Sequence, residues 1–253
     1  MLLTARAHFA EDIGRARDLV AHARMLPTGV VQDDIQRAAL MMAVGACDAY
    51  FSDAYVDLIS RALRAKDLEP GIPIPDRLNN LKVPVTAILR QARGGWRWRM
   101  AARELMEDQN VLSLEKVRGL FKQFFRTNHR GLLNQDAIEP WILHRDAKVR
   151  IFGLTATCYR ALSALEKANA RKAALEQLEV HFDSIFQRRH DCIHNCDRPK
   201  TALQPIRPAM VDKTIEDIEF LVCRCHEALA REFPEYLRAL HFNGATRNQV
   251  CQP

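Results

Sequence analysis

The residues from Arg188 to Asn195 concentrate more reactive side-chain types than any neighbouring part of this sequence. The segment reads Arg-Arg-His-Asp-Cys-Ile-His-Asn. A histidine with a pKa near neutrality can take the proton of an RNA 2′-hydroxyl or protonate a leaving 5′-oxygen. An arginine can hold a phosphate through its planar guanidinium and stabilise charge in the transition state. These residue types therefore suit RNA cleavage by the 2′-hydroxyl, a route that requires no metal ion.

The position of Arg189 in its helix adds a second argument. Apolar residues that define one buried face recur at spacings of three and four, at Leu175, Leu178, Phe182 and Ile185. The next positions on that face are Arg189 and Cys192. A permanently charged guanidinium thus stands where an apolar residue is expected, and burying it without a partner is costly. We expect Arg189 to meet an anion, a water-filled cleft or a partner subunit.

The spacing by itself is a weak signal, because Arg17 and His22 fit the same pattern. Three features of context distinguish the segment at 188–195. It continues an apolar face, it lies at a helix end, and Asn195 can adopt the left-handed conformation that terminates helices. The cations also have a simpler interpretation, as residues that complement the dipole at a helix C-terminus.

The stretch from Ile185 to Asn195 resembles the Arg-polar-x3-His signature of HEPN domains, and it is most similar to the RiboL-PSP-HEPN branch. The helices within about 145–240 and the segment Ala-Cys-Asp-Ala-Tyr at 46–50 resemble that family as well. The resemblance implies a helical bundle that dimerises and a composite active site with motifs from both protomers. It also implies an RNA-cleaving hydrolase of toxin–antitoxin, antiphage or RNA-processing systems, with an antitoxin or defence protein as a possible partner.

The resemblance assigns roles to individual residues. Arg189 matches the phosphate-binding arginine and His194 the catalytic histidine, while His190 fills the polar position after the arginine. Asp48 matches an acidic residue of an earlier helix that supports the site. Supporting roles are also expected for the residues that crowd the same helix end, namely Arg188, Asp191 and Asn195.

Helix geometry limits how Arg189 and His194 can cooperate. Residues five apart on a straight helix differ in direction by about 140°. Either the helix unwinds near Cys192, or a second protomer supplies the missing group. A two-fold axis beside the motif would allow the second arrangement, so a homodimer is expected.

The composition is that of a globular intracellular protein. The 253 residues are 48% apolar and 27% charged, and the net charge of +6 slightly favours a polyanion such as RNA. The seven cysteines lack the regular spacing of a disulfide framework, so we expect them to be reduced thiols. The first residues lack the apolar run of a signal peptide, and no apolar run is long enough to span a membrane. We expect a cytoplasmic protein.

The apolar periodicity is that of helices throughout, which predicts an all-α fold in one domain, 1–253. Helices are expected over 5–25, 33–66, 85–92, 97–110, 114–127, from about 136 to 168, 171–195 and 211–240. Segments 33–66 and 145–240 are expected to form the HEPN-like core bundle. Residues 67–144 would be an insertion or peripheral helices, and residues 242–253 a frayed tail.

Two further groups of residues have alternative interpretations. Trp96, Arg97, Trp98 and Arg99 could stack RNA bases and hold phosphates, or the tryptophans could anchor a turn to the bundle. Histidines and cysteines that could bind zinc occur at His190, Cys192, His194, Cys196, Cys223, Cys225 and His226. They include no Cys-x2-Cys pair, so we expect no metal and no cofactor.

A function of another class remains open beside the ribonuclease. The chain could be a non-catalytic helical module that keeps the fold and binds RNA, a nucleotide or a partner protein.

Overall fold

The computed structural model describes most of the chain, and its regular structure there is entirely helical. The described residues are 2–79, 96–104, 106, 111–125, 131–198 and 202–252. Across these ranges there is no strand, which confirms the predicted all-α class. The helix expected over 85–92 lies outside them.

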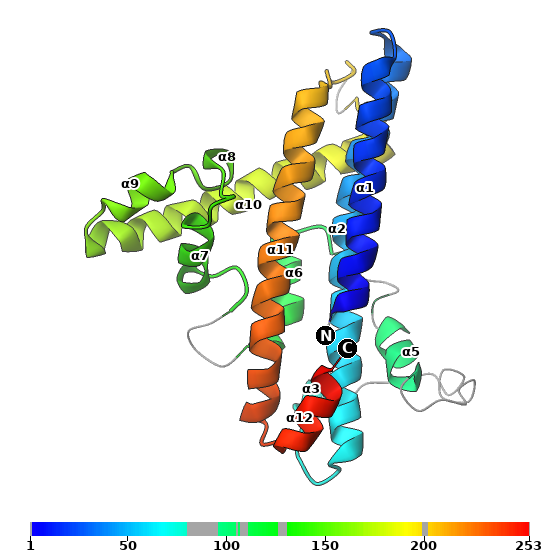
Figure 1. Ribbon diagram of the computed structural model, residues 1–253. Helices are drawn as coiled ribbons and strands as arrows, with labels where there is room; N and C mark the ends of the chain where they lie inside the picture. The colour runs from blue at the N-terminus through cyan, green and yellow to red at the C-terminus, as the bar shows by residue number, and fades with distance from the viewer. Residues whose placement is uncertain are drawn as a thin grey trace.

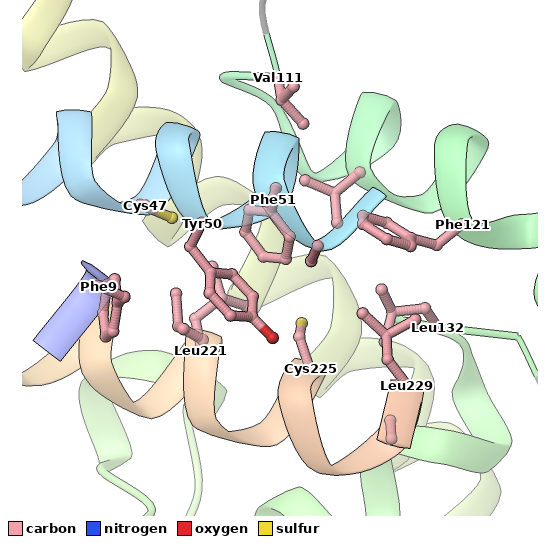
Figure 2. Close-up of a cluster of buried hydrophobic side chains, with 14 of the residues drawn as sticks. Phe9, Cys47, Tyr50, Phe51, Val111, Phe121, Leu132, Leu221, Cys225 and Leu229 are labelled. Atoms are coloured by element: carbon pink, nitrogen blue, oxygen red, sulfur yellow. The ribbon is translucent and has the colours of Figure 1, made fainter. Parts of the chain in front are cut away.

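Three long helices lie side by side and form the main bundle (Figure 1). They are α1 (Leu3–Met25), α2 (Val30–Leu68) and α11 (Pro208–Ala239). Phe9 of α1, Tyr50 of α2 and Leu221 of α11 meet in the core between them (Figure 2). Helix α1 is therefore part of the bundle, although the core expected from the sequence began at residue 33.

Helix α10 (Ala164–His194) crosses this bundle at a steep angle (Figure 1). Its N-terminal half extends away from the three long helices and packs against α7 (Gln135–Ile142) and α8 (Val149–Phe152). The helix also packs on α2 and on α6 (Leu114–Phe121). The last turns of α10, which carry the motif, therefore lie against the main bundle.

The single helix expected from 136 to 168 is wrong, because the chain there forms α7, α8 and the short α9 (Ala156–Arg160). Three helices in this region begin with an N-cap side chain that accepts a backbone N–H. The caps are Asn134 for α7, Thr155 for α9 and Ser163 for α10. Gly153 breaks the helical path with a left-handed φ of 74°. Helix α10 begins seven residues before the expected start at Arg171, since Ser163 and Glu166 form a reciprocal capping box.

The described part of residues 67–144 contributes to the core and is more than a peripheral layer. It contains α3 (Asp76–Asn79), α5 (Trp96–Glu104), α6 and a 3-10 turn, η1 (Lys122–Phe124). Phe121 of α6 is fully buried and packs on Phe51 and Tyr55 of α2 (Figure 2). Ser113 caps α6 by accepting the Lys116 N–H at 3.1 Å.

The prediction of a frayed tail is also wrong, because residues 244–251 form α12 (Gly244–Cys251) at the lower end of the bundle (Figure 1). Val250 is 1% exposed, so the helix buries an apolar face. Arg61 of α2 donates hydrogen bonds to the carbonyls of Val250 and Gln252, the latter at 2.7 Å. Among the helices that are described, none is both long and apolar enough to cross a membrane.

Candidate functional site

The apolar face of α10 ends at Arg189, as the sequence predicted. Leu178 and Phe182 are fully buried, and Ile185 is also in the core. One turn further along this face, Arg189 is half-buried, and its Nε atom is enclosed without a hydrogen-bond partner. Arg189 donates no side-chain hydrogen bond to a described residue, so the exposed part of its guanidinium retains donors for an anion.

Asp48 of α2 lies close enough to Arg189 for the two charges to interact. Burial raises the pKa of the Asp48 carboxyl, and the attraction to Arg189 offsets only part of that rise. The same carboxylate accepts the backbone N–H of Val111 at 3.1 Å, just before α6. Three parts of the chain, α2, the segment before α6 and α10, therefore meet at Arg189.

The two histidines of the motif lie on the exposed side of the same helix. The rings of His190 and His194 have centroids 4.5 Å apart, one turn from each other. Helix α10 stays regular to His194, so it does not unwind near Cys192. Arg189 and His194 consequently point in directions about 140° apart. One chain does not bring the phosphate-binding and catalytic candidates together.

A hollow of about 550 Å³ opens beside the first half of the motif. Arg189 and His190 border it. The remaining lining residues are Leu112, Asp183, Ser184, Phe186 and Gln187. The volume is within the range of small-ligand sites, roughly 300–1,000 Å³. His194 does not line this hollow.

Arg188 belongs to a different environment from its neighbour Arg189. Its guanidinium donates to Asp197 Oδ2 at 2.7 Å and to Gln204 Oε1 at 2.7 Å. Arg37 of α2 donates its Nε–H to the same Asp197 oxygen, also at 2.7 Å. Asp197 is 0% exposed. This buried ion cluster of Arg37, Arg188 and Asp197 fastens the loop after α10 onto α2.

Asp191 and Asn195 support the helix end and do not face the hollow. Asp191 is buried and accepts hydrogen bonds from Gln187, Asn195 and Gln204 at 2.9, 3.3 and 3.3 Å. The left-handed conformation expected at Asn195 occurs instead at the next two residues, Cys196 and Asp197, with φ of 46° and 58°. The chain can turn there because Asp197 is held by its two arginines.

Apart from Arg188, Asp191 and Asn195, the members of this network were not predicted from the sequence. Asp197 and Arg37 are 160 positions apart, so no local pattern links them. One signal was present: Gln36 and Arg37 are buried polar residues beside the apolar face of α2. That is the same anomaly that singled out Arg189.

A second buried carboxylate lies near another face of α10. Asp217 of α11 accepts hydrogen bonds from His181 Nε2 at 2.8 Å and from Arg150 Nε at 2.9 Å. The three residues line a pocket of about 500 Å³. Ser184 and Gln187 of α10 border both this pocket and the hollow beside Arg189.

The tryptophan–arginine segment begins α5 and does not form a turn. Trp98 is half-buried and packs against the core, which agrees with an anchoring role for this side chain. Arg99 is also half-buried. The side chains of Trp96 and Arg97 lie outside the described part.

Arg17 and His22 fit the same sequence spacing as Arg189 and His194. In the structure, Arg17 forms an ion pair with Glu219 of α11.

The candidate zinc ligands do not assemble. Among the described residues, no group of three or more histidines, cysteines or acids is placed to hold a metal ion. His190 and His194 contact each other without a third ligand. Cys225 is fully buried, and the Cys223 sulfur accepts a hydrogen bond from Arg6 at 3.0 Å.

No protein-family model, curated protein or solved structure matches this chain.

Proposed function

We propose that the protein is a metal-independent endoribonuclease of the HEPN type, acting in a toxin–antitoxin, antiphage or RNA-processing system. The observation that carries the proposal is the half-buried guanidinium of Arg189. It stands at the end of an apolar face, with an unpartnered Nε, beside a hollow and one residue before a pair of contacting histidines. A phosphodiester offers hydrogen-bond acceptors to this guanidinium, which interacts with Asp48 by charge and donates no side-chain hydrogen bond to a described residue.

The reaction follows from the chemistry of RNA. A histidine accepts the proton of the 2′-hydroxyl as the 2′-oxygen attacks phosphorus. The bond from phosphorus to the 5′-oxygen breaks, and that oxygen takes a proton from an acid. The products are a 2′,3′-cyclic phosphate and a 5′-hydroxyl. Arg189 binds the phosphate and stabilises its charge as the transition state forms.

The proposed site is shared between two protomers. Because α10 is regular to His194, Arg189 and His194 of one chain diverge. A two-fold axis beside α10 would set the exposed His190 and His194 of one protomer opposite Arg189 of its partner. The homodimer is therefore part of the functional proposal.

A second candidate is a non-catalytic helical module that binds RNA or a partner protein. The observation that favours it is the same divergence, since in a single chain the proposed catalytic histidine, His194, does not converge on Arg189. Both candidates place a polyanion against Arg189, and they differ in whether a bond is broken.

The deciding experiment is incubation of the purified protein with mixed RNA in the presence of EDTA, followed by end-group analysis. We expect cleavage that survives the chelator and leaves 2′,3′-cyclic phosphate ends. A DNA strand of the same sequence, which lacks the 2′-hydroxyl, is the control and should remain intact. Activity that is lost with EDTA and restored by zinc or magnesium would overturn the mechanism. RNA binding without cleavage would favour the non-catalytic module.

A further inference from the structure

One stripe of α10 connects the hollow to the histidines. Asp183, Gln187, His190 and His194 follow at spacings of four, three and four, so they share one exposed face of the helix. Asp183, Gln187 and His190 line the hollow, and Arg189 closes it on one side. Along the helix axis, Asp183 and Arg189 are about 9 Å apart at 1.5 Å per residue. Both residues border the hollow, so a nucleotide that lies in it can meet Asp183 with its base and Arg189 with its phosphate.

Three side chains on this wall, those of Asp183, Ser184 and Gln187, keep free hydrogen-bond acceptors. The Gln187 amide donates one of its two Nε2–H groups to Asp191 at 2.9 Å, and its Oε1 has no partner among the described residues. The Ser184 hydroxyl donates to the His181 carbonyl at 2.7 Å, so its oxygen retains only lone pairs. The exposed Asp183 carboxylate has no hydrogen bond within the described part of the chain. A carboxylate is acceptor-only when it is ionised.

An acceptor wall selects among the four RNA bases by their Watson–Crick edges. Guanine presents two adjacent donors, its N1–H and its N2 amino group, which a carboxylate can accept in parallel. Adenine and cytosine each pair one amino donor with a ring acceptor, and uracil offers one N–H between two carbonyls. Proteins commonly read single-stranded RNA through these edges.

We propose that this hollow binds a guanine base, with Asp183 accepting its N1–H and N2–H and Arg189 holding the phosphate of the same nucleotide. The inference rests on the proposed ribonuclease function and specifies its substrate as single-stranded RNA containing guanosine. Gln187 and Ser184 contribute further acceptors at the edge of the base.

The first test measures binding and does not depend on cleavage. Guanosine, inosine and adenosine monophosphates are titrated into the full-length protein by calorimetry. Inosine lacks only the N2 amino group, so we expect it to bind about 5- to 150-fold more weakly than the guanosine nucleotide, the discrimination of one bidentate contact. Equal binding of the guanosine and inosine nucleotides would overturn the proposal, and so would an absence of binding.

The second test exchanges the acceptor. Asp183→Asn replaces one carboxylate oxygen by an amide donor, so the preference should move from guanosine to adenosine monophosphate. Glu176→Gln is the matched control, because it removes an exposed acid from the same helix outside the hollow. It should leave the preference unchanged. If Asp183→Asn keeps the guanosine preference, the assignment of Asp183 is refuted.

Cleavage assays on oligoribonucleotides that contain one guanosine distinguish the guanine site from the ribonuclease function on which it rests. Cleavage at that position supports both. Cleavage without regard to guanosine refutes the guanine site and leaves the ribonuclease standing. Selective guanosine monophosphate binding without cleavage of any RNA supports the guanine site and refutes the ribonuclease.

Discussion

Arg188 and Arg189 are adjacent residues of one type in opposite surroundings, which allows a matched pair of substitutions. Arg188→Ala removes two charge-assisted hydrogen bonds of 2.7 Å from a buried cluster, whereas Arg189 donates no side-chain hydrogen bond to a described residue. We expect the first change to act on stability and the second on activity.

The magnitudes follow from the contacts. Removing one partner of a buried ion pair costs about 3–5 kcal/mol when the remaining charge is left alone. Asp197 keeps Arg37 at 2.7 Å, so the lower figure for a hydrogen bond to a charged group, about 1.5–3 kcal/mol, is the better guide for Arg188→Ala. At about 2–4 °C per kcal/mol for a chain of this size, the melting temperature should fall by roughly 3–12 °C. Arg189→Ala should cost less than about 1 kcal/mol.

Two assays give the answer. Far-UV circular dichroism during heating reports stability, and cleavage of RNA in EDTA reports activity at a temperature where both variants are folded. Arg189→Ala should lower the cleavage rate by about 10²–10³-fold, typical of a lost transition-state donor. The reasoning is refuted if Arg189→Ala unfolds the protein as much as Arg188→Ala does, or if Arg188→Ala abolishes cleavage without any loss of stability.

Three other predictions concern the shared site, the half-buried His226 and helix α12. Mixing inactive Arg189→Ala and His194→Ala chains under subunit exchange should restore part of the cleavage activity, and a mixture that stays inactive would argue against a shared site. Burial lowers the pKa of His226, so the folded state resists its protonation; the free energy of unfolding should fall as the pH drops below about 6.5, and less so in His226→Gln. Val250→Ala should cost about 1–2 kcal/mol in urea denaturation because Val250 is in the core, while Gln249→Ala, at an exposed neighbour, should change stability by less than about 0.5 kcal/mol.

The sequence predicted the helices that carry a strong apolar face and missed those whose limits depend on single polar contacts. The face through Leu178 and Phe182 located the motif helix, since burial of such a face is what stabilises a helix in a protein. The breaks after α7 and the early start of α10 depend on side-chain caps at Thr155 and Ser163. A serine or threonine within a periodic pattern can cap a helix or continue one, so the sequence did not distinguish these outcomes.

The same limit applies to the candidate site, where features of one helix were predicted and contacts from distant parts of the chain were not. Arg189 was identified from the conflict between its charge and its position, a property of one helix. The place of Arg188 in a buried ion cluster could not be predicted, because Asp197 and Gln204 reach it only through the loop that follows α10. The hollow was also beyond sequence reasoning, since Leu112, before α6, closes one of its sides.

The pairing of α1 with α11 has a consequence for how the chain is made. Arg6 of α1 donates a hydrogen bond to Cys223 of α11, and Arg17 and Arg24 of α1 form ion pairs with Glu219 and Asp212 of α11. Helix α11 begins at Pro208, so it is synthesised long after α2, which ends at Leu68 (Figure 1). At typical translation rates of about 5–20 residues per second, the α1–α2 hairpin waits on the order of 10–30 s for its third helix. During that interval the apolar face that α11 will cover is exposed to solvent. The nascent hairpin is therefore the stage at which this protein is most exposed to aggregation and most dependent on chaperones.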